Sequence, residues 1–208
     1  MSNFVKRILS SIVLIPLAFY FIFYGSYMLI FFTFICFVIA CYEWHRMTKN
    51  KPYKNYGFIF LIISFYTFYD LSVDTVGFLF VLTICVSTDI GGYIFGKIFK
   101  GPKLTKISPN KTYAGAIGGY FLSLISLTII ISYIDYPFLP VQFFITFILI
   151  STTSQIGDIT VSYFKRKSKI KNTGKIIPGH GGLLDRIDGM IFAFPIYYLV
   201  DLTGYLNI

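Results

Sequence analysis

Long runs of apolar residues, separated by short polar segments, make up most of this chain. A run of about 20 such residues is long enough to cross a bilayer as a helix. The pattern therefore predicts seven membrane-spanning helices, at 8–24, 26–43, 56–69, 75–95, 113–134, 138–157 and 187–205. We expect an all-α, polytopic membrane protein.

Composition supports this interpretation. Of the 208 residues, 56% are hydrophobic and 13% are charged, whereas a soluble domain is about one quarter charged. The three cysteines (Cys36, Cys41 and Cys85) lie inside apolar runs, without the spacing of a zinc or redox site, and are interpreted as packing residues. A hydrophobic helix directly follows the Lys6-Arg7 pair, so we expect a retained first span rather than a cleaved signal peptide.

The distribution of charge predicts the orientation. All 18 Lys and Arg residues fall in four segments, 6–7, 46–54, 97–111 and 165–186, which lie on the same side if seven spans are present. Basic loops of this kind face the cytoplasm. The prediction is N-in, C-out. The net charge of +9 does not indicate nucleic-acid binding, because the cations lie in loops between spans.

Five acids fall at the predicted cytoplasmic side: Glu43, Asp89, Asp158, Asp185 and Asp188. Carboxylates near lipid are costly and often mark ion or substrate sites. The alternative is pairing with a nearby cation, and for Glu43 an ion pair with Arg46, three residues on, is the favoured interpretation.

Asp185 and Asp188 stand three residues apart at the start of a predicted helix, so both lie on one face. Asp158 ends the preceding span, and the intervening loop can bring it close. Grouped carboxylates repel unless a cation lies among them, and oxygen ligands suit Mg²⁺. These three acids are the predicted metal ligands; capping of the last helix is the alternative for Asp185 and Asp188.

The loop between them contains a glycine run at 178–182. Glycines let backbone N–H groups approach an anion closely, so Gly181 and Gly182, flanked by three cations, predict a phosphate-binding loop. The cations are Lys165, Arg166 and Arg186. His180 contacts either a phosphate or base, or only the loop itself.

A second group lies upstream. Asp89 precedes small residues that permit close helix packing or a locally open backbone. Ser108, Lys111 and Thr112 are candidates for binding phosphate. Ser108 as the N-cap of a helix, with Pro109 at its first position, is the structural alternative, and we expect both roles.

These segments resemble phosphatidate cytidylyltransferases, also called CDP-diacylglycerol synthases. The residues that match the family signature are Ser162, Lys165, Arg166, Lys171, His180, Gly181, Gly182, Asp185, Arg186 and Asp188. The segments around Asp89 and 108–115, with Lys6-Arg7 and Glu43-Trp44, are also similar. Four positions depart from the pattern: Asn172, Ala114 and Val161 replace acids, and Asn110 replaces a lysine.

The resemblance implies transfer of CMP from CTP to phosphatidic acid, with Mg²⁺ as cofactor, in the bacterial cytoplasmic membrane. It implies a single domain over 1–208, in which 1–85 supply N-terminal spans and 86–208 supply the catalytic spans and loops. The catalytic set is Asp158, Lys165, Arg166, Asp185, Arg186 and Asp188; the substrate-binding set is Asp89, Ser108, Lys111, Thr112, Ser162, His180, Gly181 and Gly182. A second cation and a homodimer are both left open by the sequence.

Two other functions share parts of this pattern. Another lipid-linked phosphotransferase, such as a polyprenol kinase, would use the same metal and basic loops. A transporter would use the intramembrane acids, but the inverted repeat typical of many transporters is not visible in the sequence.

Overall fold

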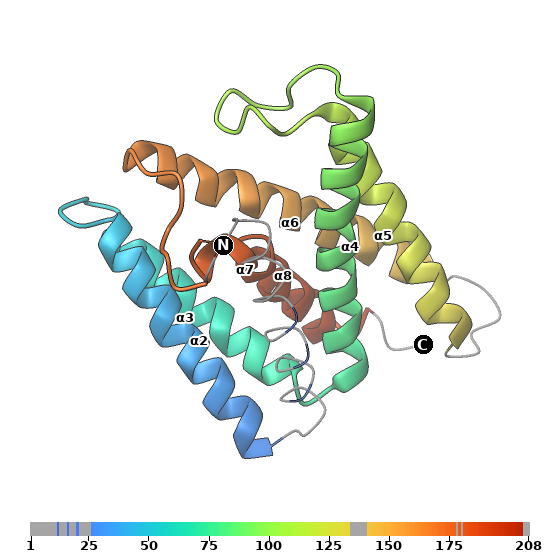
Figure 1. Ribbon diagram of the computed structural model, residues 1–208. Helices are drawn as coiled ribbons and strands as arrows, with labels where there is room; N and C mark the ends of the chain where they lie inside the picture. Colours follow the sequence, from blue (N-terminus) through green and yellow to red (C-terminus); the bar gives the residue numbers. More distant parts are fainter. Residues whose placement is uncertain are drawn as a thin grey trace. The chain divides into compact units, whose positions relative to one another are not determined.

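The computed structural model describes residues 26–133, 141–177, 179 and 181–205, together with Ile12, Pro16 and Tyr20. Within these ranges the fold is all-α, as the apolar pattern predicts (Figure 1). The helices are α2 (Ser26–Met47), α3 (Lys54–Leu71), α4 (Thr75–Phe99), α5 (Tyr113–Tyr133), α6 (Val141–Lys167), α7 (Leu184–Ile187) and α8 (Met190–Leu202).

Among the described residues, three helices are long and apolar enough to cross a membrane: Tyr27–Met47, Val76–Phe99 and Val141–Lys167. Two shorter apolar helices, Tyr113–Ile129 and Met190–Leu202, accompany them. The predicted first span at 8–24 lies almost wholly outside the described residues. The number of seven spans and their orientation remain predictions.

The boundaries differ most from the prediction at two places. Helix α6 continues ten residues past the predicted end at 157 and includes Lys165 and Arg166 in its last turn. Polar residues mark where an apolar run leaves lipid, but they do not end a helix. The last predicted span is divided: α7 ends at Ile187, and α8 begins at Met190 after a turn.

The chain divides into two compact units, and each is described by itself. Unit 1 comprises Met1–Ser72 and Phe164–Ile187; unit 2 comprises Val73–Tyr163 and Asp188–Ile208. Both are assembled from segments far apart in the sequence, because the loop after α6 belongs with the N-terminal helices.

Unit 1 is built on the α2–α3 hairpin, whose connection is held by Trp44. The indole Nε1 donates to the carbonyl of Lys54 at 2.9 Å, and a Cβ at Gly57 would overlap the indole ring. Phe164, from the end of α6, packs edge-on against Trp44 at 5.2 Å between ring centroids. The Lys167 ammonium lies 4.5 Å from the Tyr53 ring centroid. These contacts fix the start of the 168–183 loop against the hairpin.

In unit 2, α4 and α5 pack side by side through glycines (Figure 1). A Cβ at Gly115 would lie 2.7 Å from the carbonyl oxygen of Gly92, and a Cβ at Gly91 would overlap the backbone of Gly118. The small residues after Asp89 therefore serve close helix packing within a continuous helix, not a locally open backbone.

Hydroxyl pairs join the unit 2 helices across their apolar faces. Thr88 and Ser151 lie 2.9 Å apart between α4 and α6, and Tyr120 and Thr152 lie 2.7 Å apart between α5 and α6. Because each hydroxyl has a partner, these polar groups are buried without the cost of lost hydration.

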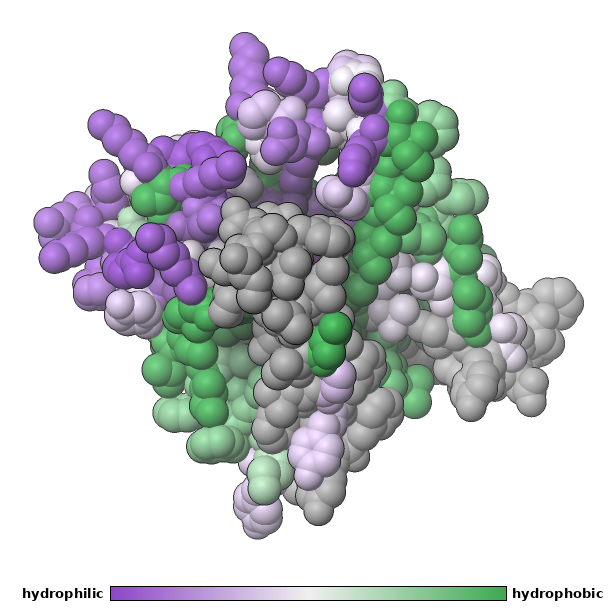
Figure 2. Space-filling model, in the orientation of Figure 1, coloured by the Kyte–Doolittle hydropathy of each residue, from purple (hydrophilic) through white to green (hydrophobic). Residues whose placement is uncertain are grey.

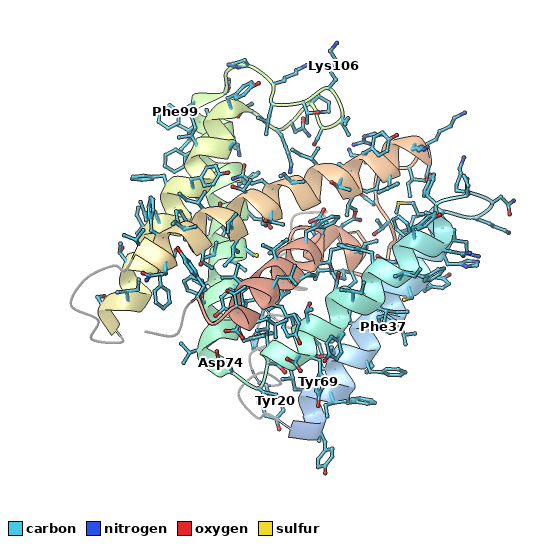
Figure 3. The ribbon with its side chains drawn as sticks, turned by 180° about the vertical axis from the view of Figure 1, so that it is seen from behind. Tyr20, Phe37, Tyr69, Asp74, Phe99 and Lys106 are labelled. Atoms are coloured by element: carbon cyan, nitrogen blue, oxygen red, sulfur yellow. The ribbon has the colours of Figure 1, made fainter. Side chains whose placement is uncertain are left out.

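The two ends of α4 differ in charge. Asp74 caps its first turn, accepting from the N–H groups of Val76 and Gly77 at 3.1 and 3.0 Å. Figure 3 shows Asp74 at one end of the helix, Phe99 at the other, and Lys106 on the loop beyond. Hydrophobic residues line α4 and hydrophilic residues cover that loop in Figure 2.

Candidate functional site

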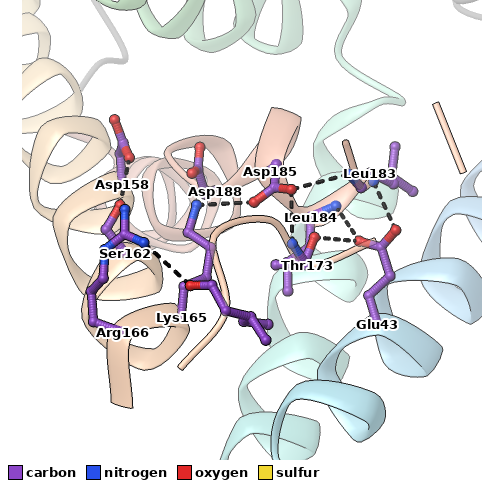
Figure 4. Close-up of polar contacts among 12 residues, drawn as sticks. Glu43, Asp158, Ser162, Lys165, Arg166, Thr173, Leu183, Leu184, Asp185 and Asp188 are labelled. Carbon is purple, nitrogen blue, oxygen red and sulfur yellow. Dashed lines mark hydrogen bonds and ion pairs between the residues drawn. The ribbon is translucent and has the colours of Figure 1, made fainter. Parts of the chain in front are cut away.

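The carboxylate of Glu43 organises the loop that carries the predicted signature. Glu43 lies near the end of α2 and is fully buried. Its Oε2 accepts from the hydroxyl of Thr173 at 2.8 Å and from the N–H of Leu184 at 2.9 Å; its Oε1 accepts from the N–H of Leu183 at 3.0 Å (Figure 4). The expected ion pair with Arg46 is wrong, because that side chain is exposed and Glu43 faces the loop.

Asp185, the residue after Leu184, also has several hydrogen-bond partners. Lys165 donates to its Oδ1 at 2.9 Å, and the two side chains are 10% and 5% exposed. The N–H groups of Thr173 and Gly182 donate to Oδ2 at 2.9 and 3.0 Å. The predicted phosphate-neutralising Lys165 and the predicted metal ligand Asp185 are therefore brought together in unit 1.

The glycine run makes a tight reversal. Ile177 and Gly181 exchange backbone hydrogen bonds of 2.9 and 3.1 Å. Gly179 and Gly181 have φ of 77° and 94°, a region that side chains disfavour. A Cβ at Gly181 would lie 2.9 Å from Asp185 Oδ2. His180 lies outside the described residues, and phosphate binding by Gly181 and Gly182 remains a prediction.

A second pair forms in unit 2. Lys111 makes an ion pair with Asp158, and the two side chains are 22% and 30% exposed. Ser162, one turn along α6, donates to Asp158 Oδ1 at 3.4 Å. The loop after α4 thus reaches α6, and three predicted site residues meet there.

Asp188 approaches the same stretch of α6. A Cβ at Gly157, the residue before Asp158, would lie 2.7 Å from the Asp188 carbonyl oxygen. A Cβ at Gly189 would overlap the hydroxyl of Ser154. The buried Asp188 accepts from the N–H of Gly189 at 3.1 Å. Glycines at both positions let the start of α8 lie against α6 beside Asp158.

The remaining candidates have simpler surroundings. Asp89, Arg166 and Arg186 are exposed, and Arg166 donates to the carbonyl of Ile170 at 3.3 Å. Thr112 caps α5 by accepting from Gly115 N–H at 3.0 Å. The expectation that Ser108 would cap this helix is wrong, because Ser108 starts a turn closed by Lys111 N–H at 3.0 Å.

Asp158 and Asp185 belong to different units, so their sharing of one cation stays a prediction. Among the described residues, no three His, Cys, Asp or Glu side chains are grouped as metal ligands. Of the departures from the family pattern, Val161 is a buried packing residue. Asn172 lies beside Gly181, where a Cβ would be 3.3 Å from its Cγ.

Comparison with known proteins identifies the family. The chain matches the model of the family described as "Cytidylyltransferase family" at residues 5–76 and 56–203. It is 36% identical to the phosphatidate cytidylyltransferase of Rickettsia felis, over 96% of this chain and 93% of that protein. It is 40% identical to the Staphylococcus saprophyticus enzyme of the same name, over 57% of this chain and 46% of that protein. The resemblance in the signature is thereby confirmed: the chain belongs to the cytidylyltransferase family.

Proposed function

We propose that this protein transfers CMP from CTP to phosphatidic acid, forming CDP-diacylglycerol and pyrophosphate. The observation that carries the proposal is the match along 96% of the chain to a relative named phosphatidate cytidylyltransferase. The match includes α2 and the loop after α6, which are joined in unit 1 by the hydrogen bonds of Glu43.

The chemistry fits side chains of this kind. The attacking group is a phosphate monoester, already largely ionised at neutral pH. A strong general base is therefore unnecessary, and the reaction depends on bringing two polyanions together in line. Lys165 and Lys111 are placed to supply positive charge, each beside a carboxylate, and Arg166 and Arg186 expose further cationic groups.

The acids present fit Mg²⁺. Asp158, Asp185 and Asp188 offer oxygen ligands, and Mg²⁺ commonly binds one or two carboxylates together with substrate phosphates. When bound, the ion neutralises charge on the phosphates and orients them. Asp185 is held by two backbone N–H groups at Oδ2 and by Lys165 at Oδ1. With Mg²⁺ beside these carboxylates, Lys165 and Lys111 would be the side chains that contribute positive charge toward the substrate phosphates.

The site is proposed to face the cytoplasm in an N-in, C-out arrangement of seven spans. All 18 basic residues lie in segments predicted on that side. One substrate is a membrane lipid and the other a cytosolic nucleotide, so a site at this interface reaches both. The cationic loops also attract anionic headgroups.

The test is turnover by the purified full-length chain. Labelled CTP, phosphatidic acid and Mg²⁺ are expected to give labelled CDP-diacylglycerol, and omission of Mg²⁺ is expected to abolish it. A parallel reaction with a polyprenol in place of phosphatidic acid is expected to give no product. Turnover of the polyprenol alone would assign the protein to another lipid phosphotransferase; turnover of neither lipid would contradict enzymatic activity of this class.

A further inference from the structure

Glu43 and Asp89 are the two acids on the predicted cytoplasmic side to which the proposed chemistry gives no role, and of these Glu43 is the buried one. Its side chain is fully buried, so it cannot contact a substrate without rearrangement. Its three hydrogen-bond donors, named above, are neutral. A charged carboxylate that accepts several such bonds gives stronger hydrogen bonds than a neutral acceptor would.

The loop is shaped around this carboxylate. A Cβ at Gly174 would overlap Glu43 Oε1, and a Cβ at Gly182 would overlap both Glu43 oxygens and the Thr173 hydroxyl. Neither glycine has a positive φ, so their backbone conformations do not require glycine. Glycine is required at both positions because the Glu43 side chain occupies the space that a Cβ would need.

The same backbone holds Asp185. Thr173 bridges the two carboxylates, since its hydroxyl donates to Glu43 and its N–H donates to Asp185. Leu183 and Leu184, bonded to Glu43, immediately precede Asp185 in the chain. A displacement of the Glu43 carboxylate would therefore move Thr173 and Leu184, and with them the Asp185 side chain.

We infer that Glu43 is a positioning residue, which acts on the reaction by fixing the loop that carries Asp185. Glu43 accepts from three donors at 173, 183 and 184, and Asp185 accepts from two further N–H groups of the loop, those of Thr173 and Gly182. The inference rests on the proposed function, because Asp185 is a proposed metal ligand there. It adds a residue on α2, about 140 positions away in sequence, to the residues that position Asp185.

The test compares the full-length protein with Glu43→Gln. A glutamine has the same shape, but its NH₂ group would face a donor, so at least one hydrogen bond is lost. We expect kcat to fall about 10- to 100-fold, because small misplacements of catalytic groups have effects of that size. KM for CTP should change less than about three-fold, because Glu43 does not touch the nucleotide. Hydrogen exchange of residues 172–186 should become faster, with other helices unchanged.

Thr173 supplies the matched controls. Thr173→Val removes the hydroxyl donor but keeps the N–H to Asp185, so it should lower kcat in the same direction, and Thr173→Ser should restore it. A double-mutant cycle gives a further control. Gly174→Ala should lower kcat in the wild-type background but cause little further loss of kcat in the Glu43→Ala background, where the side chain that the new Cβ would overlap is gone.

Wild-type kcat in Glu43→Gln would overturn the inference, as would a lower kcat with unchanged loop exchange. If Glu43→Gln does not fold, the comparison of Thr173→Val with Thr173→Ser tests the inference instead. Equal kcat values for these two variants would overturn it. If the wild-type protein makes no CDP-diacylglycerol, the proposed function fails. The exchange measurement then decides the inference separately, since unchanged exchange overturns the positioning of Asp185 and faster exchange supports it.

Discussion

Asp185 in unit 1 and Asp158 in unit 2 share a proposed task, but their surroundings differ. Asp185 is 5% exposed and is bound by Lys165 and two backbone N–H groups. Asp158 is 30% exposed and is bound by Lys111 and a longer contact to Ser162. The first carboxylate is fixed by the backbone of its own loop, and the second by side chains that can move.

From this difference we expect the two carboxylates to have different roles. A carboxylate held by backbone groups keeps its geometry before substrate arrives, which favours metal binding. A carboxylate held by one partly exposed lysine can release that lysine to an incoming phosphate more readily than a buried pair can, because the contribution of an ion pair falls as its exposure to solvent rises. The predictions below test this contrast.

Removal of the Asp185 charge should have the largest effect. Asp185→Asn is expected to lower Mg²⁺-dependent kcat about 100- to 1,000-fold, a loss typical of a preorganised charge-stabilising group. Asp70→Asn, at the exposed end of α3 in the same unit, is the control and should keep full activity. Normal turnover by Asp185→Asn would show that the metal assignment is wrong.

The two lysines should differ in their effect on folding. Lys165→Met leaves a buried carboxylate without its cation and is expected to lower the free energy of unfolding by about 3–5 kcal/mol. Lys111→Met breaks a more exposed pair and should cost less than about 1 kcal/mol. Denaturant unfolding of both variants in the same detergent measures the difference; equal losses would remove the contrast between the two sites.

A larger side chain at Gly157, where Asp188 lies against α6, should lower activity. In Gly157→Ala the new Cβ would meet the Asp188 carbonyl oxygen and the Phe192 ring, both at 2.7 Å, so α8 must shift. We expect kcat to fall about ten-fold. Gly92→Ala is the matched control, because its Cβ would lie 3.7 Å from the nearest atom, an ordinary contact. Equal activities of the two variants would contradict the required close approach.

Lys106 should give the smallest effect. It is exposed on the loop that carries Lys111. Lys106→Gln is expected to raise KM for phosphatidic acid in anionic micelles by at most about five-fold, since one surface cation contributes about 1 kcal/mol. In neutral micelles the variant should match the wild type. A large fall in kcat would place Lys106 in the site itself.

The long helices were predictable because an apolar run of membrane length leaves a strong signal. The starts of α3 and α5 lie within two residues of their predicted positions. The end of α6 was not predictable in this way, since the signal reports contact with lipid and the helix continues beyond it. The break between α7 and α8 lies at Asp188 and Gly189, whose close approach to α6 the apolar pattern does not record.

The sequence nominated candidate residues but said less about their contacts. Asp185 was selected by its spacing from Asp188, Asp158 by its place at the end of an apolar run, and Lys165 by its position beside the glycine loop. The partner of Glu43 could not be found locally, because Arg46 is near in sequence while Thr173 is 130 residues away. Thr112 rather than Ser108 caps α5 because the chain first closes a turn at Lys111, a choice that depends on tertiary contacts of the loop.

The separation between Glu43 and its loop has a consequence for biosynthesis. At synthesis rates of about 5–20 residues per second, roughly 6 to 26 seconds pass between the addition of Glu43 and the addition of Thr173. During that interval the Glu43 side chain lies near the end of a completed α2 segment whose three hydrogen-bond donors do not yet exist. A nascent chain arrested before Thr173 would therefore expose a side chain that the complete protein buries.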